Sequence, residues 1–233
     1  MGLQFRQRVR VRFDKQGLLR FISHRDLMRL FERALRRAGL PLAVTQGYNP
    51  HPRLSFPLAL GTGMAGENEV MEFELCEWMP LGAVREALTR QLPPGLLLRD
   101  LRAVSPQGST TVTAIRYQVR FLGPPPVTDD QVASLLVRES IPVGRTRKGE
   151  PKTVDIRPFL TRLHLEGDCL SVECAVRDGS TTRPEEVLAA LGVDVEAWLP
   201  RMEMARTQTV LAEPAEAAGP PRPAGRRPPR SRR

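Results

Sequence analysis

The stretch F-R-Q-R-V-R-V-R-F, residues 5–13, alternates without a break between two kinds of residue. Its odd-numbered positions are mostly apolar, and every even-numbered position is an arginine. A period of two places successive side chains on opposite faces of a β-strand. The sequence therefore predicts a strand with one face toward a core and a cationic face that carries Arg8, Arg10 and Arg12.

The residues that follow predict a β-α-β-β-α-β order. Ser23, with Asp26 three residues later, is typical of a helix start, and Gly39 of a helix end. The remaining elements are strands at residues 54–60, 71–75 and 97–104 and a second helix that begins at Pro80. This order predicts a ferredoxin-like unit, in which two helices cover one face of an antiparallel sheet.

The same order then repeats about a hundred residues later. An alternating strand at residues 113–121 precedes a helix capped by Thr128 and Gln131. The other elements are strands at 160–165, 170–176 and 202–211 and a helix from Pro184, while residues 141–156 fit no element. We expect an α+β fold of two tandem ferredoxin-like halves with antiparallel sheets, residues 1–108 and 109–211, followed by a disordered Pro/Arg-rich tail, residues 212–233.

The charge balance favours a polyanionic partner. Lysine and arginine number 35 against 26 acidic residues, for a net charge of +9, and all but three of these cations are arginine. Arginine binds phosphate oxygens as a fork and stacks on bases, although a GC-rich genome enriches the same residue. The nucleic-acid-binding candidates are the strand arginines Arg8, Arg10, Arg12, Arg116 and Arg120. Glu72 and Glu74 on a neighbouring strand are a competing partner for them, which makes a neutral, structural sheet face the alternative.

Other classes of protein find little support in the sequence. Cys76, Cys169 and Cys174 form no C-x-x-C pair, and the three histidines have no metal-ligand spacing, so we expect no metal and no cofactor. The string G-x-G-x-x-G at residues 61–66 is followed by a strand pattern, which favours a hairpin over a dinucleotide site. The absence of a long apolar run predicts a cytoplasmic protein without membrane contact.

Three long words carry a resemblance to a known family. They are V-R-F-D-K-Q-G-L-L-R-F-I-S-H-R-D-L-M-R at 11–29, F-E-R-A-L-R-R-A-G-L-P at 31–41 and Q-G-Y-N-P-H-P-R-L-S-F at 46–56, with V-D-I-R-P at 154–158 as a shorter one. The chain resembles the bacterial radical-SAM-linked family, a domain of unknown function often fused to, or encoded beside, a radical SAM protein. It departs from the commoner family pattern at Arg25 and Tyr48.

The resemblance implies an accessory role with a radical SAM partner in RNA or ribosome modification. This sequence lacks the C-x-x-x-C-x-x-C triad, so iron–sulfur chemistry would come from that partner. The family words supply the candidate site residues Ser23, His24, Asn49, His51, Arg53, Asp155 and Arg157.

Three functions remain open at this point. The first is an RNA-binding accessory module that uses the strand arginines. The second is an RNA-modifying enzyme similar in layout to pseudouridine synthases, with Asp155 as the candidate catalytic residue. The third is a protein adaptor that docks a radical SAM enzyme without touching RNA. The sequence contains no self-sufficient catalytic motif, and whether the protein is an enzyme is left open.

Overall fold

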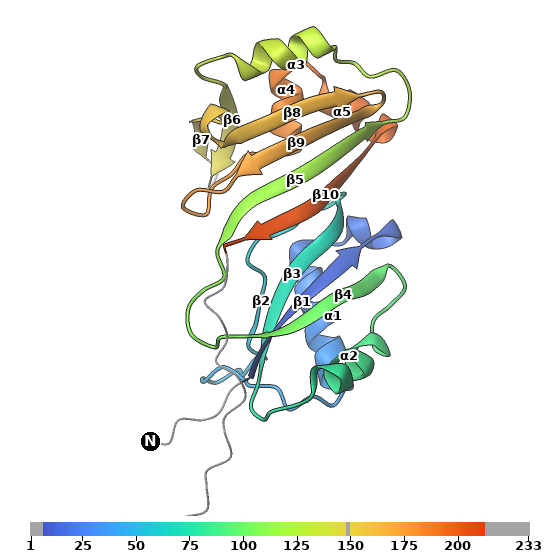
Figure 1. The fold of residues 1–233 in the computed structure, drawn as a ribbon, viewed down its shortest axis with the longest axis vertical. Coiled ribbons are helices and arrows are strands. Elements are labelled where there is room, and N and C mark those ends of the chain that lie inside the picture. Colours follow the sequence, from blue (N-terminus) through green and yellow to red (C-terminus); the bar gives the residue numbers. More distant parts are fainter. Residues whose placement is uncertain (1–6, 148–149, 213–233) are drawn as a thin grey trace, which may run out of the picture.

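The computed structural model describes residues 7–147 and 150–212 and has a mixed α+β fold (Figure 1). The first half consists of β1 (Gln7–Lys15), η1 (Gly17–Phe21), α1 (His24–Arg37), β2 (Leu54–Ser55), β3 (Ala65–Leu75), α2 (Leu81–Thr89) and β4 (Leu96–Val104). The second half consists of β5 (Val112–Phe121), α3 (Asp129–Leu136), β6 (Pro142–Arg147), β7 (Glu150–Asp155), η2 (Arg157–Phe159), β8 (Leu160–Glu166), β9 (Cys169–Ala175), α4 (Pro184–Ala190), α5 (Val195–Trp198), η3 (Leu199–Arg201) and β10 (Met202–Leu211).

The strand order confirms the predicted fold class. One path runs β4-β1-β3-β10-β5-β9-β8, with β2 paired to the side of β3. Within each half every pairing is antiparallel, and the two half-sheets show the same order of equivalent strands. Phe5 and Arg6, where the first strand was predicted to begin, lie outside the described residues. The same is true of the predicted tail from residue 213.

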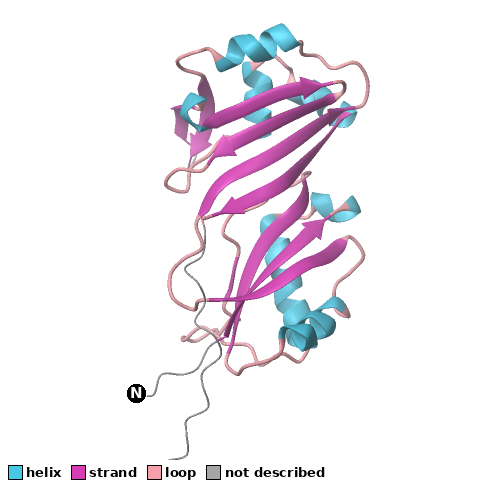
Figure 2. Ribbon diagram, in the orientation of Figure 1, coloured by secondary structure: helices cyan, strands magenta, loops and turns pink. Residues whose placement is uncertain are grey.

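The predicted helix caps are confirmed as well. The Ser23 side chain accepts a hydrogen bond from the backbone N–H of Asp26, and Gly39 follows the helix end with φ of 67°. Thr128 and Gln131 form a reciprocal capping box at the start of α3. The helices cover one face of the sheet in each half and leave the other face open (Figure 2). The apolar side chains form two cores, one of first-half residues alone and one of second-half residues together with Leu60 and Met64.

Strand β3 joins the two half-sheets because its outer edge is shared. β2 pairs with the later part of β3, at Phe73 and Glu72, whereas β10 pairs in parallel with its beginning, at Ala65 and Gly66. β2 is only two residues long, so the predicted strand at residues 54–60 is wrong beyond Ser55. Pro57 has no backbone N–H for a ladder, which accounts for the early end. The remaining edge of β3 is thus left to β10.

A buried ion pair lies where β3 meets β10. The Arg206 side chain is 1% exposed and donates from Nε to Oε1 of Glu69 at 2.7 Å, with a second contact between the same two groups. The other guanidinium protons go to the carbonyl oxygens of Leu58 and Ala59. Gly66 makes this arrangement possible, since a Cβ there would lie 2.6 Å from Cγ of Glu69. Strands from the two halves are therefore joined by a charged contact inside the core.

Residues 141–156, which fit no predicted element, form the β6–β7 hairpin. All of β7 up to Thr153 is exposed, so no apolar alternation marks it in the sequence. The hairpin lies apart from the main sheet, beside the helices of the second half (Figure 1). In the string at residues 61–66 the glycine-rich turn leads into β3, which begins at Ala65, so a strand and not a helix comes next.

The ion pair between Glu69 and Arg206 generates a stability prediction. Breaking a buried pair costs about 3–5 kcal/mol because it leaves an uncompensated charge. Lys15 is fully buried and interacts electrostatically with Glu69. Glu69→Gln therefore leaves two buried cations without a carboxylate, whereas Arg206→Met leaves Glu69 with Lys15 as its remaining partner. We expect the larger loss of unfolding free energy for Glu69→Gln, measured by denaturant unfolding.

The double variant Glu69→Met with Arg206→Met is the control for this prediction. It removes both partners together and should cost less than the sum of the single changes. Strictly additive losses would contradict the assignment of this pair as the joint between the halves.

Candidate functional site

The arginines of β1 are bound within the protein. Arg8 and Arg10 share one carboxylate, that of Glu72, with nitrogen–oxygen distances of 2.5 and 2.7 Å. Glu72 is 1% exposed, and the two arginine side chains are 15% and 14% exposed. Glu72 therefore neutralises part of the charge of Arg8 and Arg10, as expected for a structural sheet face.

The same arginines also hold the segment that connects the halves. Arg8 donates to the carbonyl oxygen of Gly108, and Arg10 donates to the hydroxyl of Thr110, between β4 and β5. Arg12 donates to the carbonyl oxygens of Asn68 and of Thr209 on β10. Burial lowers the pKa of Arg12, and neighbouring Arg10 lowers it further. Arg8, Arg10 and Arg12 thus fasten the segment between β4 and β5, and β10, to the first half.

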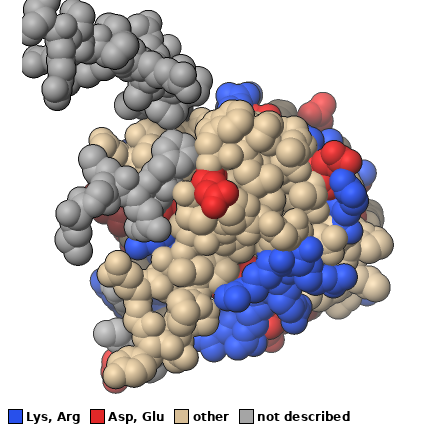
Figure 3. Space-filling model, turned by 90° about the horizontal axis from the view of Figure 1, so that it is seen from below, with Lys and Arg blue, Asp and Glu red and all other residues tan. Residues whose placement is uncertain are grey.

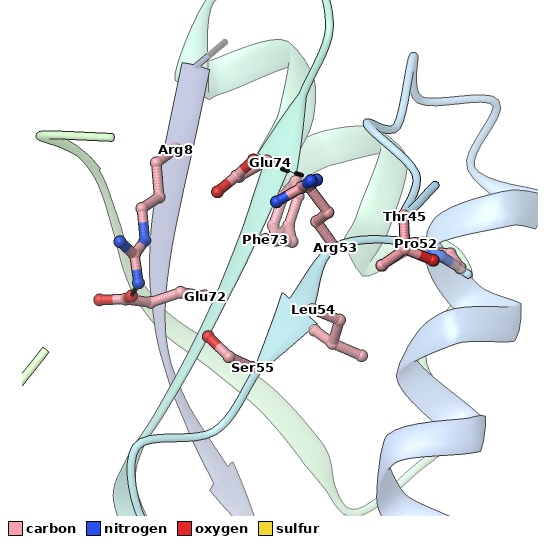
Figure 4. Close-up of a pocket in the computed structure, with 9 residues that line it drawn as sticks. All are labelled: Arg8, Thr45, Pro52, Arg53, Leu54, Ser55, Glu72, Phe73 and Glu74. Carbon is pink, nitrogen blue, oxygen red and sulfur yellow. Dashed lines mark ion pairs between the residues drawn. The ribbon is translucent and has the colours of Figure 1, made fainter. Parts of the chain in front are cut away.

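A polar pocket of about 270 Å³ opens beside the ion pair of Arg8 and Glu72 (Figure 4). It brings Arg8 from β1 together with Arg53, which comes from a family word some forty-five residues later. The full lining is Arg8, Thr45, Pro52, Arg53, Leu54, Ser55, Glu72, Phe73 and Glu74. Figure 4 shows two ion pairs at it, Arg8 with Glu72 and Arg53 with Glu74. The pocket therefore offers guanidinium donors and carboxylate acceptors side by side.

The β2–β3 pairing explains how these residues meet. The backbone N–H of Glu74 donates to the carbonyl of Arg53, which sets the register of the incoming loop against β3. Arg53 is the looser of the two cations, with Nε 3.8 Å from Oε2 of Glu74 and about a third of its side chain exposed. Thr45 and Ser55 were not among the sequence candidates, and only the predicted strand near residue 54 pointed toward them.

The loop that leads into the pocket presents polar and aromatic groups to solvent. The Thr45 hydroxyl accepts a hydrogen bond from the backbone N–H of His51 and closes the loop. Residues 44–51 are all exposed, including the candidates Asn49 and His51, and Tyr48 is exposed over its whole surface. Asn49 and His51 thus lie in the exposed loop between Thr45 and Pro52, both of which line the pocket, without lining it themselves.

The second-half candidates lie on the open face of the other half-sheet. Arg116 donates to Glu173 at 2.9 Å and to Gln208 at 2.7 Å. It also lines a groove of about 350 Å³ that includes Arg162 and His164. Arg120 is exposed and forms no ion pair with any other residue that the structure describes. Acidic and basic groups thus alternate on this face too.

Ser23 and His24 are at the start of α1 and do not line the pocket. Ser23 is the helix cap, and the His24 ring packs edge-on against Phe56 with centroids 5.2 Å apart. Burial lowers the pKa of His24, and the charges of Arg206 and Lys15 lower it further. This histidine belongs to the surroundings of the buried ion pair.

Asp155 and Arg157 make local contacts at the base of the β6–β7 hairpin. Oδ1 of Asp155 accepts hydrogen bonds from the backbone N–H of Ile141 at 2.8 Å and of Arg157 at 3.0 Å. The Arg157 guanidinium donates to the carbonyls of Leu136, Arg138 and Leu160. These contacts fasten the hairpin to α3 and β8. A catalytic role for Asp155 stays a prediction.

Asp155 should therefore affect stability in a pH-dependent way. Backbone hydrogen bonds from Ile141 and then Arg157 lower the pKa of its carboxyl group. A lowered folded-state pKa means that the stabilisation is present above the unfolded value, near 3.9, and is lost as the pH falls. We expect Asp155→Ala to lower Tm at pH 7, with a smaller difference from the parent at pH 3, measured by thermal unfolding. Asp155→Asn keeps an acceptor oxygen and is the milder control, and equal Tm values for all three proteins at pH 7 would exclude the structural role.

Comparison with known proteins identifies the family. The chain belongs to the family described as "Uncharacterized protein conserved in bacteria (DUF2344)", whose model matches residues 8–184. This range includes the four sequence words quoted above. The family description names no radical SAM protein. No curated protein gives a significant match.

Solved structures give distant matches. A chain of the "Cbf5-Nop10-Gar1 Complex" matches with a TM-score of 0.42 and 11% identity over 88% of this chain and 49% of that one, and the "archaeal box H/ACA sRNP Nop10-Cbf5 complex" with 0.39 and 11% over 87% and 48%. This chain thus spans about half the length of those relatives. An unknown protein from Galdieria sulphuraria matches with 0.28 and 15% over 86% of this chain and 96% of that one. In the part of the chain that the structure describes, no helix is long and apolar enough to span a bilayer.

Proposed function

We propose that this protein is an RNA-binding accessory module whose pocket between Arg8 and Arg53 receives an unpaired base. The observation that carries the proposal is the pairing of two guanidinium groups with two carboxylates around one pocket of about 270 Å³. The RNA contact then lies at the pocket beside Arg8, because Arg10 and Arg12 of β1 are engaged by other groups of the protein.

The charge pattern of the pocket favours a base over a phosphate. A phosphate group would lie against the carboxylates of Glu72 and Glu74, which repel it. A nucleobase edge presents hydrogen-bond donors next to acceptors. Arginine donates to carbonyl and ring-nitrogen acceptors, and a carboxylate accepts from an exocyclic amine. Arg53 and Glu74 together offer both kinds of contact.

The loop beside the pocket suits an unpaired strand. Sequence-specific RNA recognition uses bases that are splayed out, stacked on aromatic rings and hydrogen-bonded on their edges. Tyr48 is fully exposed, and Asn49 and His51 follow it in the same exposed loop. Tyr48 lies in the loop between the pocket residues Thr45 and Pro52, so we expect a base stacked on it to be a neighbour of the base in the pocket.

The accessory part of the proposal rests on the sequence resemblance to radical-SAM-linked proteins. The chain itself has no radical SAM cysteine triad, so a modification reaction would need a partner enzyme that supplies it. In this arrangement the protein binds the RNA, and the partner performs the chemistry.

The test measures binding of the full chain to a single-stranded RNA oligonucleotide. Stacking on an aromatic side chain contributes about 1–3 kcal/mol per base. We therefore expect Tyr48→Ser to weaken binding roughly tenfold, as 1.4 kcal/mol corresponds to a factor of ten, and the addition of Arg53→Gln to weaken it further. Phe21→Ser removes another exposed aromatic side chain, in η1, and should leave the affinity unchanged.

Arg8, Arg10 and Arg12 are unsuitable for this experiment. Their removal would leave Glu72 buried without a partner and would destabilise the fold for reasons unrelated to RNA. Equal affinities for the Phe21 variant and the double variant of Tyr48 and Arg53 would contradict the pocket and its loop as an RNA site. If no RNA binds but a radical SAM enzyme co-purifies in the presence of ribonuclease, the adaptor function replaces this proposal.

A further inference from the structure

Helix α1 carries a second concentration of arginine that the strand pattern does not include. Five exposed arginines lie along its fourteen residues, and its buried side chains belong to the core. They are Arg25, Arg29, Arg33, Arg36 and Arg37. The only acidic residues of the helix are Asp26 and Glu32, and the one ion pair within the described helix is long, with 3.7 Å between Nη1 of Arg29 and Oδ1 of Asp26.

The arginines form one face. At about 100° per residue, four of the five lie within a sector of about 80°, and Arg37 extends it to about 120°. The buried residues Leu27, Phe31 and Ala34 lie on the opposite side of the helix. From Arg25 to Arg37 the face is about 18 Å long at 1.5 Å per residue. The helix therefore holds a straight, rigid row of cations.

Helix stability does not explain this row. Like charges four residues apart disfavour a helix, and the row contains three such pairs, starting at Arg25, Arg29 and Arg33. Arg36 and Arg37 interact favourably with the negative end of the helix dipole, but Arg25 lies at the opposite end. The spacing is thus retained against a local electrostatic cost. A polyanion bound along the face would offset it.

The end of the molecule formed by the first half carries a basic patch. Figure 3 views the molecule from the end formed by the first half and shows lysine and arginine side chains gathered in one broad patch. α1 runs toward this end of the molecule (Figure 1). Unlike Arg8 and Arg10 of β1, the arginines of α1 form no ion pair with a buried carboxylate among the residues that the structure describes.

We propose that the arginine face of α1 binds the phosphate backbone of double-stranded RNA. Arginine matches phosphate geometry with two parallel hydrogen bonds, and duplex RNA is recognised mainly by shape and by backbone contacts. A rigid row of 18 Å suits a rigid duplex. The inference rests on the proposed function in one respect, that the partner is RNA, but it uses a different surface and a different form of RNA.

The experiment measures binding of the full chain to a blunt RNA duplex over a series of salt concentrations. Each phosphate contact adds about 0.7–0.9 to the slope of log affinity against log salt. Changing Arg29, Arg33 and Arg36 to Gln should reduce this slope by about two to three. Glutamine is a good helix former, and far-UV circular dichroism will show that α1 is intact.

The matched control changes Arg138, Arg177 and Arg201 to Gln. These residues are also exposed, and the variant has the same net charge as the α1 variant. We expect the slope of log affinity against log salt to decrease clearly less in this control than in the α1 variant. Equal slopes for the two triple variants, or no duplex binding by the parent protein, would overturn the proposal.

The two RNA surfaces are separated by the choice of probe. Tyr48→Ser and Arg53→Gln should leave duplex binding unchanged, because a blunt duplex has no unpaired base for the pocket. If the pocket variants have no effect on single-stranded RNA but the α1 variant lowers the duplex slope, the pocket function fails and the α1 inference stands. The converse result would retain the pocket and exclude α1.

Discussion

The buried ion pair between Glu69 and Arg206 is the contact on which the arrangement of the two halves depends. A guanidinium group that is 1% exposed needs a partner, and Arg206 finds it in Glu69, three residues along β3 from Gly66, which is opposite Arg206 in the ladder. The ladder between these strands is short, with pairs only at Ala65 and Gly66. The ion pair therefore adds a specific contact where the backbone pairing is limited.

Charge serves two purposes in this molecule. On β1 it is internal, because Arg8, Arg10 and Arg12 satisfy a buried carboxylate, the linker and the end of β10. On α1 it is presented to solvent without comparable compensation. A row of arginines in a sequence therefore does not by itself indicate a binding surface. Whether it forms one depends on the carboxylates and carbonyl groups that the fold places beside it.

The sequence predicted much of the fold and only part of the site. Strands with one buried face, such as β1 and β5, and helices with capping residues, such as α1 and α3, carry local signals that their tertiary contacts reinforce. The β6–β7 hairpin lacks a buried face and left no such signal. Glu72 was considered as a partner for the β1 arginines because antiparallel strand order is predictable. The pocket itself was not predicted, since it depends on the register between β2 and β3, which no local pattern specifies.

Arg8 has a place in both the pocket and the joint between the halves. One of its terminal nitrogens contacts Glu72, and the other donates to the carbonyl of Gly108 in the connecting segment. A pocket occupant that draws this guanidinium toward itself competes with the connecting segment for the same hydrogen-bond donors. Occupancy of the pocket and tightness of the joint are then thermodynamically linked, and the linkage is reciprocal. An occupant of the proposed pocket would in this way also alter how the connecting segment is fastened at Gly108.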